Sequence, residues 1–559
     1  MNTTFSFFRK VHAFLLRSGY IWRAIPVIRS GTAMGALATL LLLSASMLPA
    51  QNSSTSSLAG AVTDPSGAVI SGAVVTVRNL STQVKHVTKT SAAGVFKILF
   101  LNPGLYSVTV EKPGFATVVD DNLHLELDQT GRFDTTMKVG SAKGEVVSVS
   151  SAVPLLDTDS SSVSTVFSEE MVHELPLVGR TPTQLAILAP GTSTTMSDKM
   201  GTGTGGSIDP GRVDVGGSRV FTIDATLDGA PMILPGDNNF GNMVPSMDAV
   251  SEFSVVQGNF GAQYGGGTSV LNIVLHNGTN QFHGSAFDFI QNDDLNAQYG
   301  FSGGKQRLRY NQFGGTIGGP ILRNRLFAFF AYQNTRVPSS SPSIVTVPTD
   351  AEKAGDFSAI CPTLNGAGQC TDNGVVTQIY NPVNGQPYAN NQIPSSQFDS
   401  VAKNLLTYFP EPNYGANGAL INNYFRLRPQ TQQTPIYNGK LTWTITQKHT
   451  LAISVHNEPY SQAGEGQIPG PVCYGGGCGS SFTHDQLYQL TEQWVVTPHL
   501  VNSFAASVAH EAYGLAAPSQ DGNYPSKLGL TQNISQVYFP SFSWTGNAAF
   551  PGTSVGPGS

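Results

Sequence analysis

Charge is the scarcest property of this sequence. Of its 559 residues, 30 are Lys or Arg and 36 are Asp or Glu, so charged residues make up 12% of the chain, whereas ordinary soluble domains carry about 25%. The net charge of −6 gives no basic surface, which excludes nucleic acid as a partner on electrostatic grounds. The shortage of Glu, Lys and Leu also excludes coiled coils and long helical bundles.

Disorder is excluded too, because hydrophobic residues make up 40% of the chain and aromatic residues 9%, which is too many for a chain that fails to fold. Glycine and proline are abundant, with 60 and 34 residues. A chain poor in charge and rich in glycine and small polar residues suits strands and turns, so we expect a mainly β protein.

Cysteines are few. The four are Cys361, Cys370, Cys473 and Cys478, and their even number, in two close pairs, predicts two local disulfides in an exported chain. A metal site is the alternative, although no histidine or carboxylate stands in a zinc-like spacing beside either pair. The eleven histidines form no cluster along the sequence, so we expect no metal ligand and no cofactor.

Long apolar runs are confined to the N-terminus. Residues 1–50 begin with basic residues and no acid, continue into an uncharged run over residues 31–50, and end in small residues. This layout predicts a secretory signal peptide cleaved near Ala50. The alternative is an N-terminal membrane anchor, since the run could just span a bilayer. Beyond residue 50 there is no apolar stretch of about 18 residues, so no further transmembrane helix is predicted.

Residues 56–140 read as a β-sandwich. Short alternating runs at 58–62, 73–77, 95–99 and 106–110 are separated by Gly- and Pro-containing turns, which is the spacing of sandwich strands. The pattern resembles the carboxypeptidase-regulatory-like domain, and the positions that carry the resemblance include Gly60, Asp64, Gly67, Gly72, Gly94, Pro103, Gly104, Tyr106 and Gly114. The resemblance implies a prealbumin-like, carbohydrate-binding-like fold without peptidase chemistry.

Residues 144–278 differ from the preceding segment, because short helices are predicted here besides strands. A short helix is predicted over 168–175, capped by Ser168, and a second one ends at Pro190-Gly191 before a Gly-rich stretch at 201–217. The segment resembles the α/β plug domain of TonB-dependent outer-membrane receptors, especially the Oar-like group. The motif positions are Leu175, Pro176, Leu177, Gly179, Arg180, Asp228, Gly229, Asp248, Glu252 and Phe253.

The start of this segment could contact a partner protein. Its residues Glu145, Val146, Val147, Ser148 and Val149 could serve as the energy-coupling strand that the TonB complex reads by strand addition. A plain linker strand is the alternative.

Residues 280–559 contain seven candidate strands of about ten residues, as in outer-membrane barrels. They lie at about 281–291, 308–318, 326–334, 437–446, 450–456, 486–496 and 500–510. Their connections alternate strictly between short turns and long loops, which predicts part of an antiparallel transmembrane β-barrel. A soluble antiparallel protein is the alternative. Residues 282–285 and 311–315 also resemble the first strands of Oar-like barrels.

Sequence matches to enzyme motifs occur, but they lack the flanking strands and helices that these motifs require. Gly201, Gly203 and Gly206 have the spacing of a dinucleotide-binding fingerprint, but they follow no strand and open no helix. Two Gly-x-Ser-x-Gly-like matches, at 300–304 and 552–556, lack the strand before and the helix after that a nucleophile elbow requires. We therefore expect no enzyme.

The resemblance implies an outer-membrane receptor that binds an extracellular ligand and imports it by TonB-coupled plug movement. Its partners would be the TonB complex in the periplasm, outer-membrane lipid and an unknown ligand, which could be a glycan, a peptide or protein, or a metal chelate. The plug and sandwich would lie on the periplasmic side. The alternatives are a surface adhesin, scaffold or carbohydrate-binding outer-membrane protein without transport, a truncated non-transporting remnant, and a secreted glycan-binding protein.

The length of the chain does not fit a complete receptor of this kind. Single-chain bacterial barrels have even strand counts from about 8 upward, and outer-membrane transporters use about 22 strands around a plug. Seven predicted strands are odd and too few. We therefore expect an N-terminal fragment of a receptor roughly twice as long, or a truncated gene product, because an unclosed sheet in lipid leaves edge groups unpaired.

Overall fold

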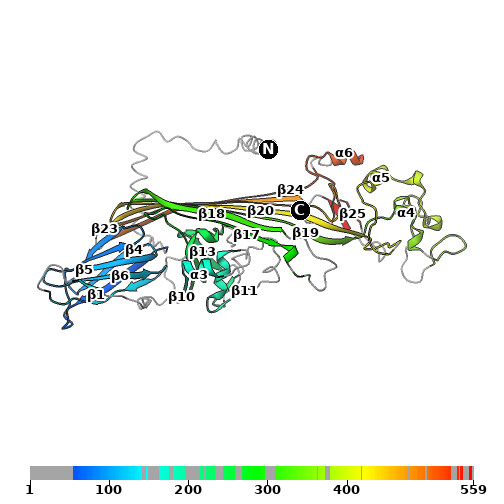
Figure 1. The fold of residues 1–559 in the computed structure, drawn as a ribbon. Coiled ribbons are helices and arrows are strands. Elements are labelled where there is room, and N and C mark those ends of the chain that lie inside the picture. The colour runs from blue at the N-terminus through cyan, green and yellow to red at the C-terminus, as the bar shows by residue number, and fades with distance from the viewer. Residues whose placement is uncertain are drawn as a thin grey trace, which may run out of the picture. The chain divides into compact units, whose positions relative to one another are not determined.

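The computed structural model describes most of the chain after the leader, namely residues 54–140, 146–148, 163–175, 180–194, 213–217, 222–232, 243–258, 267–295, 297, 309–361, 363–371, 378–416, 418–474, 479–497, 500–530, 538–540, 542–544 and 553–556. All of these belong to one unit, Gln51–Ser559, and Figure 1 labels its main helices and strands. The predicted signal peptide, residues 1–50, lies outside the described residues.

The N-terminal strands form two sheets. One has the order β4-β1-β7, with β8 also paired to β1, and the other has the order β3-β2-β5-β6-β9. Burial alternates along β1 and β2, as expected when one face of each strand is packed. Apolar side chains from both sheets form one buried cluster that includes Leu58, Val75, Phe96 and Val108. The strands are β1 Ser56–Thr63, β2 Val74–Asn79, β3 Lys85–Lys89, β4 Val95–Leu101, β5 Gly104–Glu111, β6 Thr117–Leu125, β7 Thr130–Arg132, β8 Thr135–Thr136 and β9 Val146–Ser148.

Gly60 marks a close approach inside this sandwich. A Cβ atom at residue 60 would lie 1.8 Å from the carbonyl oxygen of Phe133 and 2.9 Å from the Phe96 ring. The adjacent backbone is fixed, because the Phe133 N–H donates to the Ala59 carbonyl at 2.8 Å. Only glycine therefore fits at this position of β1.

Gly60→Ala should loosen the sandwich. Overpacking costs about 1–3 kcal/mol, and a clash with backbone atoms lies at the upper end because the neighbour cannot rotate away. Hydrogen–deuterium exchange should show faster exchange in β1 and β4. Gly366→Ala is the matched control, since nothing lies within 4 Å of a Cβ at residue 366. Unchanged exchange in β1 of the Gly60 variant would contradict this account of the packing.

A central segment follows the sandwich. Its main sheet has the order β10-β15-β16-β13-β14, in which β13 and β16 are parallel and the other pairs antiparallel. Every residue of β16 is buried. The elements are β10 Val163–Phe167, α3 Glu169–Glu174, a 3-10 helix η1 Pro182–Leu188, β11 Thr192–Thr194, β12 Val213–Val215, β13 Ile223–Leu227, β14 Ala230–Pro231, a 3-10 turn η3 Met247–Ala249, β15 Val250–Gln257 and β16 Ser269–Leu275.

Two details of this segment differ from the sequence prediction. Ser168 occupies the N-cap position of α3, but its side chain makes no capping hydrogen bond. The second predicted helix is a 3-10 helix that ends at Leu188, before Pro190. This helix has seven residues and connects α3 to β11, and 3-10 geometry is frequent in connectors.

The C-terminal half contains the long sheet, which we define as strands β17 to β24. Among the described residues, seven strands pair in chain order, β17-β18-β19-β20-β21-β23-β24, and each pair is antiparallel. This confirms the predicted strand order. The strands are β17 His283–Asn292, β18 Arg309–Leu322, β19 Leu326–Val345, β20 Tyr424–Thr446, β21 His449–Gly464, β23 Gly479–Thr497 and β24 Leu500–Ala516. The predicted length of about ten residues is confirmed for β17 alone among these seven strands, and it is wrong for the other six, which have 14 to 23 residues.

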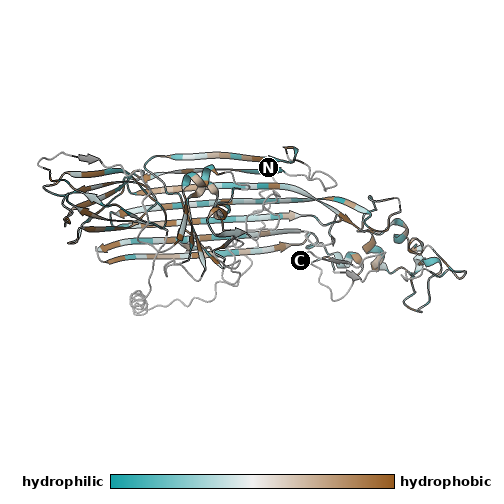
Figure 2. Ribbon diagram, turned by 90° about the horizontal axis from the view of Figure 1, so that it is seen from below, coloured by the Kyte–Doolittle hydropathy of each residue, from teal (hydrophilic) through white to brown (hydrophobic). Residues whose placement is uncertain are grey.

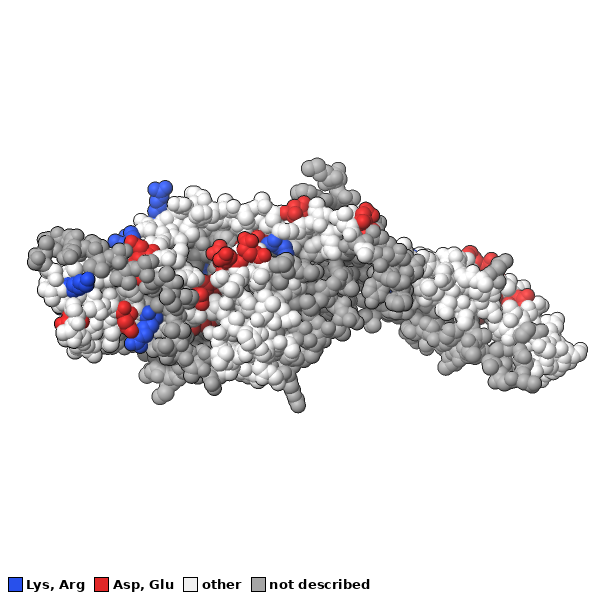
Figure 3. Space-filling view, turned by 60° about the horizontal axis from the view of Figure 1, so that its bottom comes forward, with Lys and Arg blue, Asp and Glu red and all other residues white. Residues whose placement is uncertain are grey.

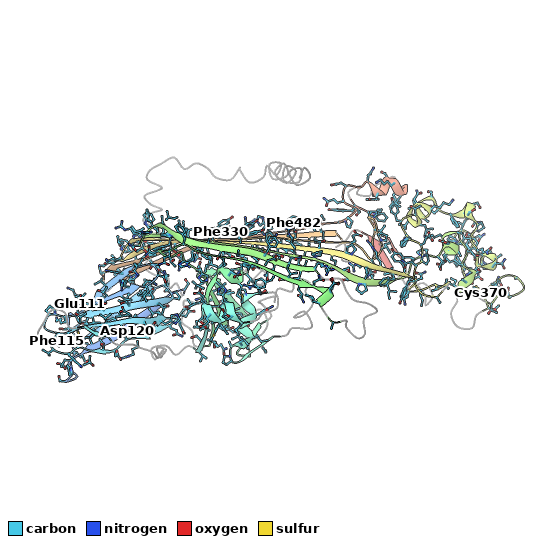
Figure 4. The ribbon with its side chains drawn as sticks, viewed as in Figure 1. Glu111, Phe115, Asp120, Phe330, Cys370 and Phe482 are labelled. Carbon is cyan, nitrogen blue, oxygen red and sulfur yellow. A yellow bond between two sulfur atoms is a disulfide. The ribbon has the colours of Figure 1, made fainter. Side chains whose placement is uncertain are left out.

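The two faces of the long sheet differ in chemistry. One cross-strand row on the first face runs through five strands and consists of Phe330, Gly439, Val455, Tyr488 and Val508, each paired with the next. Three of its large side chains are exposed: Phe330 by 46%, Tyr488 by 44% and Val508 by 65%. Hydrophobic and hydrophilic residues alternate along the strands (Figure 2), and Phe330 and Phe482 in Figure 4 both belong to the exposed apolar set. One face is therefore suited to lipid.

The opposite face carries buried polar side chains and meets the central segment. Phe329, Ala331 and Leu487 of the long sheet belong to the same buried cluster as Leu271 and Phe253 of the central sheet. Charged side chains are sparse on the molecular face seen in Figure 3. In the described part of the chain, no helix has the length and apolar character needed to cross a membrane.

The segments between the long strands pack together at one end. A buried cluster joins residues from β19, β20 and the later loops, among them Val347, Phe409, Ile468, Leu528 and Phe539. Thr349 and Glu352 form a reciprocal capping box at the start of α4. The short elements here are η4 Asp293–Leu295, α4 Asp350–Lys353, η5 Ser358–Ile360, η6 Ala389–Asn391, η7 Ser395–Gln397, α5 Ser400–Leu406, β22 Cys473–Tyr474, α6 Tyr524–Leu528, β25 Phe542–Trp544 and β26 Thr553–Gly556.

Candidate functional site at the junction of the central and long sheets

Asp228 and Gly229 form the tight turn between β13 and β14. Both residues have positive φ, 51° for Asp228 and 86° for Gly229. Two consecutive positive φ angles are the requirement of a two-residue type I′ hairpin, which Asp-Gly meets with little strain. The turn therefore explains the residue pair that the sequence singled out, and it places the Asp228 carboxylate at the tip of a hairpin.

The Asp228 carboxylate is bound by the long sheet. Lys440 Nζ donates to its Oδ1 at 2.7 Å and Ser454 Oγ donates to its Oδ2 at 2.6 Å. The backbone N–H of Leu275 also donates to Oδ1, at 3.1 Å. Gln489 Nε2 donates to the backbone carbonyl of Asp228 at 2.8 Å. One turn of the central segment thus contacts three neighbouring strands of the long sheet.

Register explains why these partners converge. Lys440 pairs with Ser454, and Ser454 pairs with Gln489, so the three side chains stand in one row on the same face of β20, β21 and β23. The side chains of Lys440 and Asp228 are only 8% and 6% exposed. A buried ion pair is stable only when further hydrogen bonds satisfy both charges, and here Lys440 also donates to the Leu275 carbonyl at 3.1 Å.

Two further hydrogen bonds join the same surfaces. Thr442 Oγ1 donates to Asn277 Oδ1 at 2.8 Å, and the Ser246 N–H donates to Asn438 Oδ1 at 3.2 Å. Together with the Asp228 row they make a polar contact surface. Polar interfaces between packed parts are typical of contacts that form and break in function.

Arg180 and Asp248 make a second attachment. Arg180 Nη2 donates to Asp248 Oδ2 at 2.9 Å, and the Arg180 guanidinium lies 4.0 Å from the Phe289 ring centroid and 5.3 Å from that of Phe287. Both rings belong to β17, the first strand of the long sheet. The stacked guanidinium therefore ties the motif arginine to this strand through cation–π contacts. Leu175 follows α3, whereas Pro176, Leu177 and Gly179 lie outside the described residues.

Glu252 and Phe253 face different neighbours from adjacent positions of β15. Phe253 is fully buried and its ring stacks on that of Phe167 at 5.3 Å. Glu252 is 5% exposed, and its Oε2 accepts a hydrogen bond at 2.8 Å from the N–H of Leu127, which follows the sandwich strand β6. Burial raises the pKa of Glu252 to about 8, and the nearby carboxylates of Glu126, Glu169 and Asp128 act in the same direction.

Asp128 extends this contact between sandwich and central segment. Its Oδ2 accepts from Ser254 Oγ at 2.6 Å, and its two carboxylate oxygens accept from Asn272 Nδ2 at 3.1 and 2.9 Å. The loop after β6 therefore holds the faces of β15 and β16 by side-chain hydrogen bonds.

The candidate coupling strand pairs with the sandwich. Val146, Val147 and Ser148 form β9, which lies parallel to β6 in register with Thr117, Val118 and Val119. Glu145 and Val149 lie outside the described residues. Both readings of this segment, a coupling strand and a plain linker, are consistent with an extended backbone.

Of the two expected disulfides, the one whose cysteines both lie in the described part of the loops is present. Cys361 and Cys370 are bonded, with Cα atoms 5.7 Å apart, and Cys370 lies in the loop region labelled in Figure 4. Cys473 lies in β22, and Cys478 is outside the described residues.

Sequence reasoning missed the partners of Asp228 and one side-chain cluster. Lys440 is the one charged residue of the predicted strand 437–446, which otherwise alternates, and this was the available signal for a buried ion pair. The expectation that the histidines form no cluster is wrong for two of them, because the His173 and His276 rings stack with centroids 6.1 Å apart.

Comparison with known families agrees with this architecture. Residues 274–559 match a family model described as an outer membrane beta barrel domain, and residues 57–138 match the carboxypeptidase regulatory-like domain. The first range contains the long sheet, and the second contains the sandwich strands β2 to β8 and β1 except Ser56.

Similar proteins include a curated transporter and solved receptors. The chain is 25% identical over 503 residues to the TonB-dependent transporter Oar of Myxococcus xanthus, which covers 83% of this chain and 40% of that protein. The chain thus spans less than half the length of this relative. The siderophore receptor PirA from Acinetobacter baumannii is similar at a TM-score of 0.36, with 14% identity, over 66% of this chain and 42% of PirA. The alcaligin receptor FauA from Bordetella pertussis is similar at 0.31, with 12% identity, over 65% and 50%.

These matches confirm the resemblance to the Oar-like group, the mainly β fold class and the location in the outer membrane. The barrel model covers more than half of the chain. The chain therefore belongs to the family of outer membrane β-barrel domain proteins.

Proposed function

We propose that the chain acts in TonB-dependent uptake, with the central segment as the plug and the long sheet as part of the barrel wall. The observation that carries this proposal is the row of Lys440, Ser454 and Gln489 around Asp228. A junction that contains a large share of polar contacts can hold a plug in place and can also separate in function, as polar interfaces between packed parts do.

In this proposal the ligand binds from outside, and the TonB complex pulls on the plug from the periplasm. The sandwich and plug lie on the periplasmic side, and the long loops that carry the Cys361–Cys370 disulfide face outward. A glycan, a peptide or protein, or a metal chelate remain the candidate ligand classes. The chain itself performs no enzymatic reaction in this scheme, because the energy arrives mechanically through a paired strand.

The coupling strand provides the test. Val147→Pro removes a backbone donor from the middle of β9 and should lower the affinity of the chain for the periplasmic TonB domain by about tenfold or more. Binding can be measured by co-sedimentation of that domain with vesicles that contain the chain. Val147→Ile keeps every backbone group and is the matched control. Equal binding of the proline and isoleucine variants would contradict a coupling role for this segment.

A further inference from the structure

Three potential metal ligands lie together at the edge of the central segment. Glu169 and His173 stand four residues apart on α3, which places them on one helix face, and His276 follows directly after β16. One ligand atom from each of the three residues lies within 4.8 Å of the other two. His276 Nε2 is 3.8 Å from Glu169 Oε1.

The scaffold behind these side chains is rigid. Val172, on the flank of α3 beside these two side chains, is fully buried. The backbone N–H of His276 donates to the Ala249 carbonyl at 2.9 Å, and its ring packs against Phe329 at 5.4 Å. Both imidazoles are partly exposed, at 29% for His173 and 21% for His276, so an ion can reach them without unfolding.

A carboxylate also stands behind one imidazole. Asp248 Oδ1 lies 4.0 Å from His173 Nδ1, while its other oxygen accepts from Arg180. A carboxylate next to the second nitrogen of a histidine orients the ring and increases its basicity as a ligand. At 4.0 Å Asp248 is not hydrogen-bonded to His173, but a small rotation of the ring would bring the two groups into that arrangement.

Two imidazoles and one carboxylate are the donor set of zinc and similar first-row ions, whereas Mg²⁺ and Ca²⁺ prefer oxygen ligands alone. Tetrahedral zinc with bonds of about 2.1 Å needs ligand atoms about 3.4 Å apart. The three ligand atoms lie within 4.8 Å of one another, so small rotamer changes, easiest for Glu169 with its 66% exposed side chain, would bring them to this spacing. A cavity of about 730 Å³ borders all three residues and leaves room for a water molecule as fourth ligand.

We propose that Glu169, His173 and His276 form a zinc-binding site. The ligands come from α3 and from the segment that leads from β16 into β17, so a bound ion would cross-link the helix to the connection between the central and long sheets. This inference does not depend on TonB coupling or on any transported ligand.

Metal titration of the purified full-length chain in detergent micelles tests the proposal. Isothermal titration with ZnCl₂ should give one site per chain that does not respond to MgCl₂, and CoCl₂ should produce visible absorption bands of a low-symmetry site. His173→Ala and His276→Ala should each weaken Zn²⁺ binding by about 100-fold or more, since even outer partners contribute about 10–100-fold.

A second variant distinguishes the loss of a metal ligand from misfolding of the chain. Glu169→Gln changes an exposed side chain and should weaken Zn²⁺ binding by about tenfold without altering the circular dichroism spectrum. His510→Ala, at an exposed histidine on β24, is the matched control and should bind as the unmodified chain does. Absence of Zn²⁺ binding to the unmodified chain, or equal affinity in the three ligand variants and the control, would overturn the proposal.

Discussion

Asp228→Asn is expected to release the central segment from the long sheet. The substitution leaves the ammonium group of Lys440, which is 8% exposed, in a buried position without its counter-charge. Removing one partner of a buried ion pair costs about 3–5 kcal/mol. Hydrogen–deuterium exchange of the chain in lipid nanodiscs should therefore rise in β13, β14 and β16, and first of all at the Leu275 amide that donates to Asp228.

The control for this prediction removes both charges. In Asp228→Asn/Lys440→Met no uncompensated charge is buried, and replacement of a buried ion pair by uncharged side chains of similar size is often neutral. The double variant should therefore regain most of the protection that the single variant loses. Equal loss of protection in the single and double variants would show that the charge pair is not what holds the junction.

The contact between the sandwich and the central segment is expected to weaken as pH rises. Burial raises the pKa of Glu252 from 4.5 to about 8, so the docked form binds its proton more tightly than the undocked form does. The stabilisation is complete below the ordinary pKa of 4.5, falls as pH rises above it, and is lost above the raised pKa of about 8. At about 1.4 kcal/mol per pKa unit, a change of up to about 5 kcal/mol in docking between these limits is expected.

Glu252→Gln provides the measurement for this effect. The glutamine oxygen can still accept the Leu127 N–H bond, but it does not titrate. Limited proteolysis between the sandwich and the central segment should accelerate with pH in the unmodified chain and stay constant in the variant. Glu111→Gln, at an exposed site on β5 labelled in Figure 4, should retain the pH dependence. A proteolysis rate that depends on pH equally in all three proteins would refute the role of Glu252.

Strand order could be predicted from the sequence, but strand length could not. Alternation of residues such as Leu451, Ile453 and Val455 marks the part of a strand with one apolar face. Beyond that part β19 continues through Pro338 and Pro342, which pair with Thr431 and Leu427 of β20. The two strands stay paired there although most of the residues are polar. Prolines normally argue against a central strand, so the sequence pattern gave no reason to extend the predicted strand through them.

The Asp-Gly turn could likewise be predicted, because local backbone geometry demands those two residues. Its partners could not, since Lys440, Ser454 and Gln489 lie 212, 226 and 261 residues further along the chain. The contact between His173 and His276 could not be predicted for the same reason, since the two residues are far apart in the sequence. Which distant polar residues meet is decided by sheet register and by how the central segment packs, and neither is encoded in a short motif.

Cysteine cross-linking of the plug to the barrel in cells tests the central claim most directly. Asn277 and Thr442 are hydrogen-bonded across the junction at 2.8 Å, so Asn277→Cys/Thr442→Cys should form a disulfide under mild oxidation, with the two single variants as controls. If the TonB complex pulls the plug, the yield in outer-membrane fractions should be high and should rise further when an uncoupler collapses the proton-motive force. No cross-link in the outer membrane, or a yield that the uncoupler leaves unchanged, would contradict the account.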